Sequence, residues 1–414
     1  MPRSSQAEAG SLLIAAVSGR QLAHAARRAG FTPLVADFFA DTDTQAAAHA
    51  CRKLGGDIAS GMRRQTLLPA LRALAARAPS PILGLVYGAG FEDRPALLTL
   101  IAKHWPLLGN TAATVARLKA PESFFTELDR LGIAHPATTS ERPRKGAGWI
   151  AKRKGGAGGS HIAPSRLQRD AGSIYYQERV AGRAVSALFL ANGRRARVLG
   201  FSEQWTAPTP RSPFRYGGAV RPASLRPSVA RQMASAVAAI ARSFAIVGLA
   251  SADFLVDGDE ALLLEINPRP GATLDIFDSG AKPLMRMHLE AIRERRLPRS
   301  GLKFDDAMAS AIVYSPVRLC VPSGTAWPDW FADRPKPAER IDKNRPVCTV
   351  LARGNTRAQA KRLAEERICR ILNGFQGVSR GANVEQKGRN RRGSAQGVAE
   401  RQRPGGAARQ SADR

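Results

Sequence analysis

The chain is poor in the residues that mark membrane-spanning, disulfide-bonded and zinc-binding proteins. Near its start the longest apolar stretch, residues 12–17, has six residues, too few to cross a bilayer or to form a signal peptide. Four cysteines are scattered at positions 51, 320, 348 and 369. There is no CxxC pair and no histidine cluster at metal-ligand spacing, so we expect reduced thiols. These absences predict a cytoplasmic protein without a membrane partner.

Acidic residues are scarce: 34 Asp and Glu stand against 63 Lys and Arg, for a formal net charge of +29. Such an excess of positive charge can bind the phosphate backbone of nucleic acids. The sequence, however, lacks RNA-binding motifs, zinc-finger motifs and basic motifs interleaved with aromatic residues. The excess is also spread: residues 377–414 carry nine basic and three acidic side chains, so +6 lies there and +23 elsewhere. This distribution argues against nucleic acid and suits an enzyme for anionic substrates; a basic nucleic-acid-associated protein stays as an alternative.

What the chain does have is length and apolar content: 414 residues at 44% hydrophobic predict two or three folded domains. In the first third, short apolar runs alternate with helical patterns, which predicts a parallel α/β layer with ligands at its strand ends. A full GxGxxG is missing, which argues against a dinucleotide site. Polar residues and glycines occupy those strand ends, and each could either form a turn or contact a substrate. They are Ser18, Gly19, Arg20, Asp37, Asp41, Asp43, Thr44, Gly88, Gly90 and Glu92.

After residue 146 the apolar pattern changes from helical spacing to alternation, which predicts antiparallel sheets. The predicted regions are 1–105, the parallel α/β domain; 106–300, two α+β lobes of about 110–185 and 186–300; 301–373, an α+β accessory region; and 374–414, a basic tail. The tail has almost no apolar residues, so we expect it to be disordered.

A hairpin signal at residues 257–258 brings three oxygen-bearing side chains together. If the loop occupies residues 258–260, Asp253 stands directly opposite Glu265, and Asn267 lies two residues further along the same face. Two carboxylates at this distance repel each other, so a divalent cation is the natural neutraliser, and the amide oxygen adds a ligand without charge. Magnesium suits these hard oxygen ligands, with manganese as the other candidate.

Arg269 continues the same alternation two residues beyond Asn267, and its guanidinium could hold a phosphoryl or acyl-phosphate oxygen with two hydrogen bonds. The structural alternative is that Glu265 pairs with Arg269 or with another cation at a sheet edge. Burying Glu265 beside three leucines would cost several kcal/mol without such a partner.

A strand lysine followed by a glycine-rich loop gives a second signal. Lys152 ends an apolar strand, and the loop behind it contains Gly155, Gly156, Gly158 and Gly159. Their backbone N–H groups can fold over phosphates while the lysine reaches an α- or β-phosphate. The lysine precedes the glycines, so this is no P-loop, and a flexible hairpin is the alternative. Ser160 and His161 close the loop; His161 has no evident carboxylate partner and fits a ligand contact better than a general base.

The stretch YYQERVAG offers a third, weaker signal, a hinge for a purine. Gln177 and Glu178 end a strand, and Val180 follows before the next glycine. Backbone N–H and C=O groups at such a hinge can meet the edge of a base between apolar walls. Glu178 could equally be a solvated strand residue.

Together, KRKGGAGGSHI, YYQERVAG and ADFLVDGDEALLLEINPR resemble the motifs of the ATP-grasp superfamily of carboxylate–amine ligases, over roughly residues 10–315. The resemblance implies a pre-ATP-grasp α/β domain followed by two lobes with antiparallel sheets that hold ATP between them. The residues it implicates are Lys119 and Lys152 with Gly155, Gly156, Gly158, Gly159 and Ser160 for the phosphates, Gln177, Glu178 and Val180 for adenine, and Asp253, Glu265 and Asn267 for Mg²⁺. Lys152 and Arg269 would act on the reacting phosphate. The sequence AGRAVSALF has no acid where such enzymes often hold the ribose, so ribose recognition is unassigned.

The reaction implied by this resemblance begins with a substrate carboxylate attacking Mg-ATP to give an acyl phosphate and ADP, after which an amine displaces phosphate. The block after about residue 307 resembles accessory regions of uncharacterised ATP-grasp proteins in one-carbon cofactor gene neighbourhoods, which implies a pterin or furan carrier. Two rivals stay open: a carboxylase-type enzyme that activates bicarbonate, and a protein for which ATP is only a ligand. The expected partners are a small carboxylate and an amine, with a homodimer as one assembly to consider.

Overall fold

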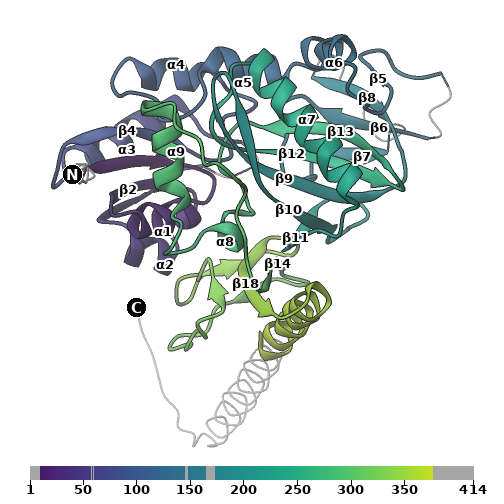
Figure 1. The fold of residues 1–414 in the computed structure, drawn as a ribbon. Helices are drawn as coiled ribbons and strands as arrows, with labels where there is room; N and C mark the ends of the chain where they lie inside the picture. The colour runs from purple at the N-terminus through teal and green to yellow at the C-terminus, as the bar shows by residue number, and fades with distance from the viewer. Residues whose placement is uncertain (1–9, 57, 59, 145–147, 165–172, 376–414) are drawn as a thin grey trace, which may run out of the picture.

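The computed structural model describes residues 10–56, 58, 60–144, 148–164 and 173–375, and it contains an N-terminal parallel layer, a small antiparallel sheet and a large antiparallel sheet (Figure 1). The predicted fold class, parallel α/β followed by two antiparallel lobes, is confirmed. Residues from 376 onward, most of the predicted tail, lie outside the described residues. In the described ranges no helix has the length and apolar character needed to cross a membrane.

The N-terminal layer is a four-stranded parallel sheet in the order β3-β2-β1-β4. Its elements are β1 (Ser11–Ala15), α1 (Arg20–Arg28), β2 (Thr32–Asp37), α2 (Thr42–Ala47), β3 (Ala50–Lys53), α3 (Arg64–Ala75), β4 (Ile82–Tyr87) and α4 (Ala96–Ala102). Strand β1 is buried at every position, as expected for a parallel strand covered on both faces.

The small sheet has the order β5-β8-β6-β7 and follows two short helices. The elements are α5 (Ala112–Lys119), α6 (Pro121–Arg130), β5 (Thr138–Thr139), β6 (Trp149–Arg153), β7 (Ile162–Pro164) and β8 (Ile174–Glu178). The Thr111 hydroxyl caps α5 by accepting the Thr114 N–H at 3.2 Å, and Pro121 opens α6 where its missing N–H costs nothing. The cap sets where α5 begins, and the proline limits where it ends, at Lys119.

The large sheet has eight strands in the order β13-β12-β9-β10-β11-β14-β18-β16. Its strands are β9 (Arg183–Asn192), β10 (Ala196–Thr206), β11 (Tyr216–Arg221), β12 (Val247–Asp257), β13 (Glu260–Asn267), β14 (Ala307–Tyr314), β16 (Phe331–Ala332) and β18 (Pro346–Gly354). The remaining elements are α7 (Pro227–Ser243), α8 (Leu274–Phe277), α9 (Leu284–Arg293) and the pair β15 (Leu319–Cys320) and β17 (Arg340–Ile341). Strands β14 and β18 thus continue the sheet across the boundary predicted at residue 300.

The two faces of the large sheet are covered by different elements. Along β9, Phe189 packs in the cluster that includes α7, while Leu188 and Leu190 pack in the cluster that includes α1, α8 and α9. Ser186 and its cross-strand partner Asp253 follow the second set by strand alternation. The polar side chains of β12 and β13 therefore lie on the face of the sheet that is turned toward the N-terminal layer.

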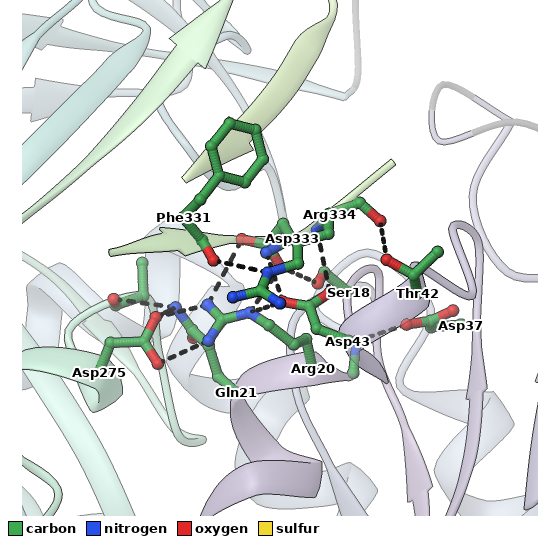
Figure 2. Close-up of polar contacts among 12 residues, drawn as sticks. Ser18, Arg20, Gln21, Asp37, Thr42, Asp43, Asp275, Phe331, Asp333 and Arg334 are labelled. Atoms are coloured by element: carbon green, nitrogen blue, oxygen red, sulfur yellow. Dashed lines mark hydrogen bonds and ion pairs between the residues drawn. The ribbon is translucent and has the colours of Figure 1, made fainter. Parts of the chain in front are cut away.

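A buried ionic network joins three distant parts of the chain (Figure 2). Arg20, at the start of α1, donates to both carboxylate oxygens of Asp275 at 2.9 and 2.5 Å and through Nε to Asp333 at 2.9 Å. Asp43 accepts the backbone N–H groups of Asp333 and Arg334, each at 2.9 Å. The network therefore fastens the segment after β16 and the helix α8 to the strand ends of the N-terminal layer.

Candidate active site

Two carboxylates and an amide converge on the β12–β13 hairpin. Asp253 pairs directly with Glu265 across the hairpin, which confirms the predicted register. The Asn267 amide donates to Asp253 at 2.9 Å and to Glu265 at 3.4 Å, and the Ser186 hydroxyl donates to Asp253 at 2.6 Å. Three oxygen-bearing side chains therefore meet at one end of the hairpin.

Lys119 is the partner of Glu265. Its Nζ lies 3.2 Å from a Glu265 oxygen and 3.2 Å from the Asn267 amide oxygen, and its side chain is 8% exposed. The lysine is the last residue of α5, and only Ala120 separates it from the proline that starts α6. In the structural alternative, pairing of Glu265 with Arg269 is wrong, since Arg269 pairs with Glu92, whereas pairing with another cation at the sheet edge is what Lys119 provides.

The electrostatics of the two carboxylates differ. Burial and repulsion from Glu265 raise the pKa of Asp253. Burial opposes ionisation of Glu265 as well, but the nearby Lys119, His161 and Lys152 outweigh it and lower the pKa of Glu265. The pair therefore takes up its first proton on Asp253, and a divalent cation would favour ionisation of both groups.

The donor set fits magnesium, because Mg²⁺ is commonly held by one or two carboxylates and completes its shell with water and phosphate oxygens. Within the ranges that the structure describes, no cluster of three or more His, Cys, Asp and Glu side chains forms a self-sufficient metal cage. Asp253, Glu265 and Asn267 could thus hold the ion together with phosphates. Their role as metal ligands stays a prediction.

The side chains of Lys152 on β6 and Gln177 on the neighbouring strand β8 contact each other on one face of the small sheet. The Lys152 ammonium donates to the Gln177 side-chain oxygen at 2.6 Å, and both residues are buried. Burial lowers the pKa of Lys152 to about 8. At the hinge, the Glu178 N–H donates to the Ala137 carbonyl at 2.8 Å, and Val180 lies in the connection between β8 and β9. Adenine contacts from Gln177, Glu178 and Val180 stay predictions.

The glycine-rich loop is packed between two other regions. A β-carbon on Gly155 would lie 2.6 Å from the Asp93 Cα, and one on Gly159 would lie 1.9 Å from the Phe214 carbonyl oxygen. The Gly158 carbonyl accepts the Tyr216 N–H at 3.0 Å. Glycine is required at 155 and 159 because a side chain there would collide with the backbone of another segment. Gly155 also lines a small cavity together with Lys119 and Glu265.

The other residues of the loop differ in exposure. Gly156 lies against the His161 ring, such that a β-carbon on Gly156 would overlap it. His161 is buried, its Nδ1 lies 3.3 Å from the Ala157 carbonyl oxygen, and burial lowers the pKa of its imidazole to about 4. Ser160 is exposed. The histidine ring is therefore neutral near pH 7, and phosphate contacts from Gly156 and Ser160 stay predictions.

Substituting two neighbouring glycines should separate loop closure from backbone strain. Gly158 and Gly159 both have positive φ, +68° and +71°, but a β-carbon on Gly158 meets nothing within 4 Å. We expect Gly158→Ala to cost about 1 kcal/mol, the usual cost of that backbone conformation. Gly159→Ala should also force the loop away from Phe214. Thermal unfolding and limited proteolysis of the loop should show a clearly larger effect for Gly159→Ala, and equal effects would contradict the packed arrangement.

Arg269 is paired with an acid at the end of β4. Its Nε donates to Glu92 at 2.7 Å, and Glu92 also accepts the N–H groups of Gly90 and Phe91. Both side chains are buried, and although burial opposes it, Arg269 and Lys119 lower the pKa of Glu92. The sequence places Glu92 among the polar residues at the parallel strand ends but gives it no specific role in the site. Contact of Arg269 with a reacting phosphate stays a prediction.

A comparison with family models matches residues 123–273 to the ATP-grasp domain. No curated protein matches the chain by sequence.

Solved structures share the fold over most of their length. An L-amino acid ligase from Bacillus licheniformis aligns with TM-score 0.66 at 14% identity, covering 88% of this chain and 97% of the ligase. N5-carboxyaminoimidazole synthetase from Staphylococcus aureus, complexed with ADP, gives 0.62 at 14% identity over 87% and 97%. Biotin carboxylase from Campylobacter jejuni gives 0.63 at 14% identity over 85% and 89%. At this identity the similarity establishes the fold.

Proposed function

Since the chain carries an ATP-grasp domain and has the ATP-grasp fold, we propose that it is an ADP-forming ligase that activates a substrate carboxylate with Mg-ATP and transfers the acyl group to an amine. The observation that carries the proposal is the convergence of Asp253, Glu265 and Asn267 with Lys119. Gly155 and Gly156 of the glycine-rich loop line one cavity with Lys119 and Glu265. The relatives named above as an L-amino acid ligase and as a synthetase complexed with ADP support the proposal.

The residues of this chain would divide the work of binding ATP. Lys119, Lys152 and the glycine-rich loop would hold the phosphates, the connection after β8 would hold adenine, and Asp253, Glu265 and Asn267 would hold Mg²⁺. The ion, when bound, neutralises phosphate charge and so makes the γ-phosphate easier to attack. Manganese would serve the same ligands.

Arg269 would orient the reacting end of the substrate. Glu92 fixes the guanidinium through Nε, and Nη1 donates to the Pro270 carbonyl at 3.3 Å, so Nη2 would be the nitrogen that meets an anionic oxygen. Exclusion of water on substrate binding would limit hydrolysis of the acyl phosphate before an amine arrives. Most of the rate enhancement would come from positioning of the reactants and from preorganised charges. A nucleophilic side chain is not required for this chemistry.

The proposal is tested by trapping the activated acid. Hydroxylamine converts an acyl phosphate into a hydroxamate, so full-length protein is incubated with Mg-ATP, hydroxylamine and a panel of acids that includes glutamate and carboxylated pterin and furan carriers. We expect hydroxamate and ADP in equal amounts with at least one acid. ADP release that depends on bicarbonate alone would favour the carboxylase alternative, to which the biotin carboxylase similarity points. ATP binding without turnover on any acid or bicarbonate would overturn the enzyme assignment.

Nucleotide affinity should fall as the pH rises through the pKa of Lys152. That pKa is lowered to about 8, so the ammonium is charged below pH 8 and neutral above it. Because only the charged form attracts phosphate, we expect Mg-ADP affinity to drop about tenfold from pH 7 to pH 9. Isothermal titration checks this, with Lys152→Met as the control: it should bind weakly at both pH values. A wild-type affinity that does not change over this range would contradict the role of Lys152.

A further inference from the structure

Tyr216 contacts the glycine-rich loop from strand β11 of the large sheet. It opens β11, its N–H donates to the Gly158 carbonyl at 3.0 Å, and its ring packs against the cluster that includes Leu188 and Phe277. Burial raises the pKa of the Tyr216 phenol far above its ordinary value, and the nearby Asp253, Tyr314 and Asp275 add to the rise. The phenol therefore stays protonated and acts as a hydrogen-bond donor, never as a base.

The Tyr216 hydroxyl is buried, and among the described residues it has no hydrogen-bond partner. The neighbouring carboxylates are already engaged: Asp253 accepts side-chain hydrogen bonds from Ser186, Gln204 and Asn267, and Asp275 accepts them from Arg20 and Gln21. A buried hydroxyl without a partner is unfavourable and rare in folded proteins. A donor in this position, beside the groups that would hold the metal, indicates an acceptor supplied by a ligand.

We propose, on the basis of the function proposed above, that the Tyr216 hydroxyl, which is buried and unpartnered at the glycine-rich loop, donates a hydrogen bond to a carboxylate oxygen of the acyl substrate. The position fits a reacting carboxylate, because the loop that touches Tyr216 is the one that would cover the phosphates. A neutral donor also suits this place: it stabilises the anion without competing with the metal for Asp253 and Glu265. Tyr216 would thus bind the acid, while Arg269 and the lysines act on the phosphate.

The test uses the full chain saturated with Mg²⁺ and the non-hydrolysable analogue AMPPNP, with acetate and L-glutamate as carboxylate probes in isothermal titration. We expect Tyr216→Phe to weaken binding of these probes at least about tenfold, as for loss of a hydrogen bond to a charged group. AMPPNP affinity should change less than about twofold, and the melting temperature should stay equal or rise, because the buried hydroxyl is unpaired without ligand.

Tyr314→Phe is the matched control. Its hydroxyl donates to the Tyr216 carbonyl at 2.9 Å, so its removal should lower the melting temperature and leave probe affinity within about threefold. The proposal is overturned if wild-type protein binds AMPPNP but neither probe, or if Tyr216→Phe binds the probes as wild type does. It is also overturned if Tyr216→Phe weakens AMPPNP but not ADP, since the acceptor would then be a γ-phosphate oxygen. Absence of Mg-ADP binding by wild-type protein would instead reject the proposed function.

Discussion

Replacing Glu265 with glutamine should reduce ADP formation at least about a thousandfold while the protein stays folded. The substitution keeps the shape of the side chain but removes one of the two charges that would hold Mg²⁺. Lys119 would keep the Asn267 oxygen and gain the new amide oxygen as acceptors, so the helix end stays in place. Steady-state ADP release with the acid found by hydroxamate trapping, together with thermal unfolding, checks both parts.

Glu260→Gln is the matched control for this experiment. Glu260 starts the same strand that contains Glu265, but its side chain is exposed. Its backbone stands opposite that of Asp257, beside the hairpin turn. The change in charge is identical, so normal activity in Glu260→Gln would exclude a general effect of net charge. An active Glu265→Gln variant would reject the metal assignment.

Arg20→Met should destabilise the protein by about 3–5 kcal/mol, the range measured when one partner of a buried ion pair is removed. The substitution removes the guanidinium from the buried Asp275 carboxylate and from Asp333, whose side chain is 21% exposed, since Arg20 contacts both. Gln21 and Ser18 also donate to these acids, but neither carries charge. Urea unfolding at pH 7 measures the loss.

Arg27→Met provides the comparison on the same helix. Arg27 is exposed and donates to the Ala46 carbonyl at 2.8 Å, so its loss leaves no buried carboxylate behind and the expected cost is at most about 1 kcal/mol. If both variants lose the same small amount, the buried network contributes little to stability and the segments it joins are held by apolar packing instead.

The hairpin shows how far local sequence patterns can reach. The expected loop of residues 258–260 is wrong by one residue, because Asp257 pairs with Glu260 and the turn contains two residues. The pairing of Asp253 with Glu265 is nevertheless correct, because a β-bulge at Leu264 adds the residue that the turn lacks. Alternation of side chains predicts which face a residue takes, whereas turn length and bulge compensate each other and cannot be separated by pattern alone.

Partners distant in sequence could not be predicted in this way. The sequence required a cation for Glu265, but Lys119 is 146 positions away and Arg269 only four. Similarly, the sequence marks Arg20 as a polar residue at a strand end, but its partners Asp275 and Asp333 lie 255 and 313 positions away. Such pairs depend on how helices and sheets pack, since any of the many arginines and lysines of this chain could meet the charge requirement equally well.

The position of β14 and β18 has a consequence for dissecting the protein. Because β14 pairs with β11, a fragment that stopped near residue 300 would leave the backbone N–H and C=O groups of β11 bare. An open strand of this kind recruits other chains. The C-terminal strands therefore protect an edge of the same sheet that contains the carboxylate hairpin, from which β14 is separated by the three strands β9, β10 and β11. Removing them would expose the sheet that positions the hairpin.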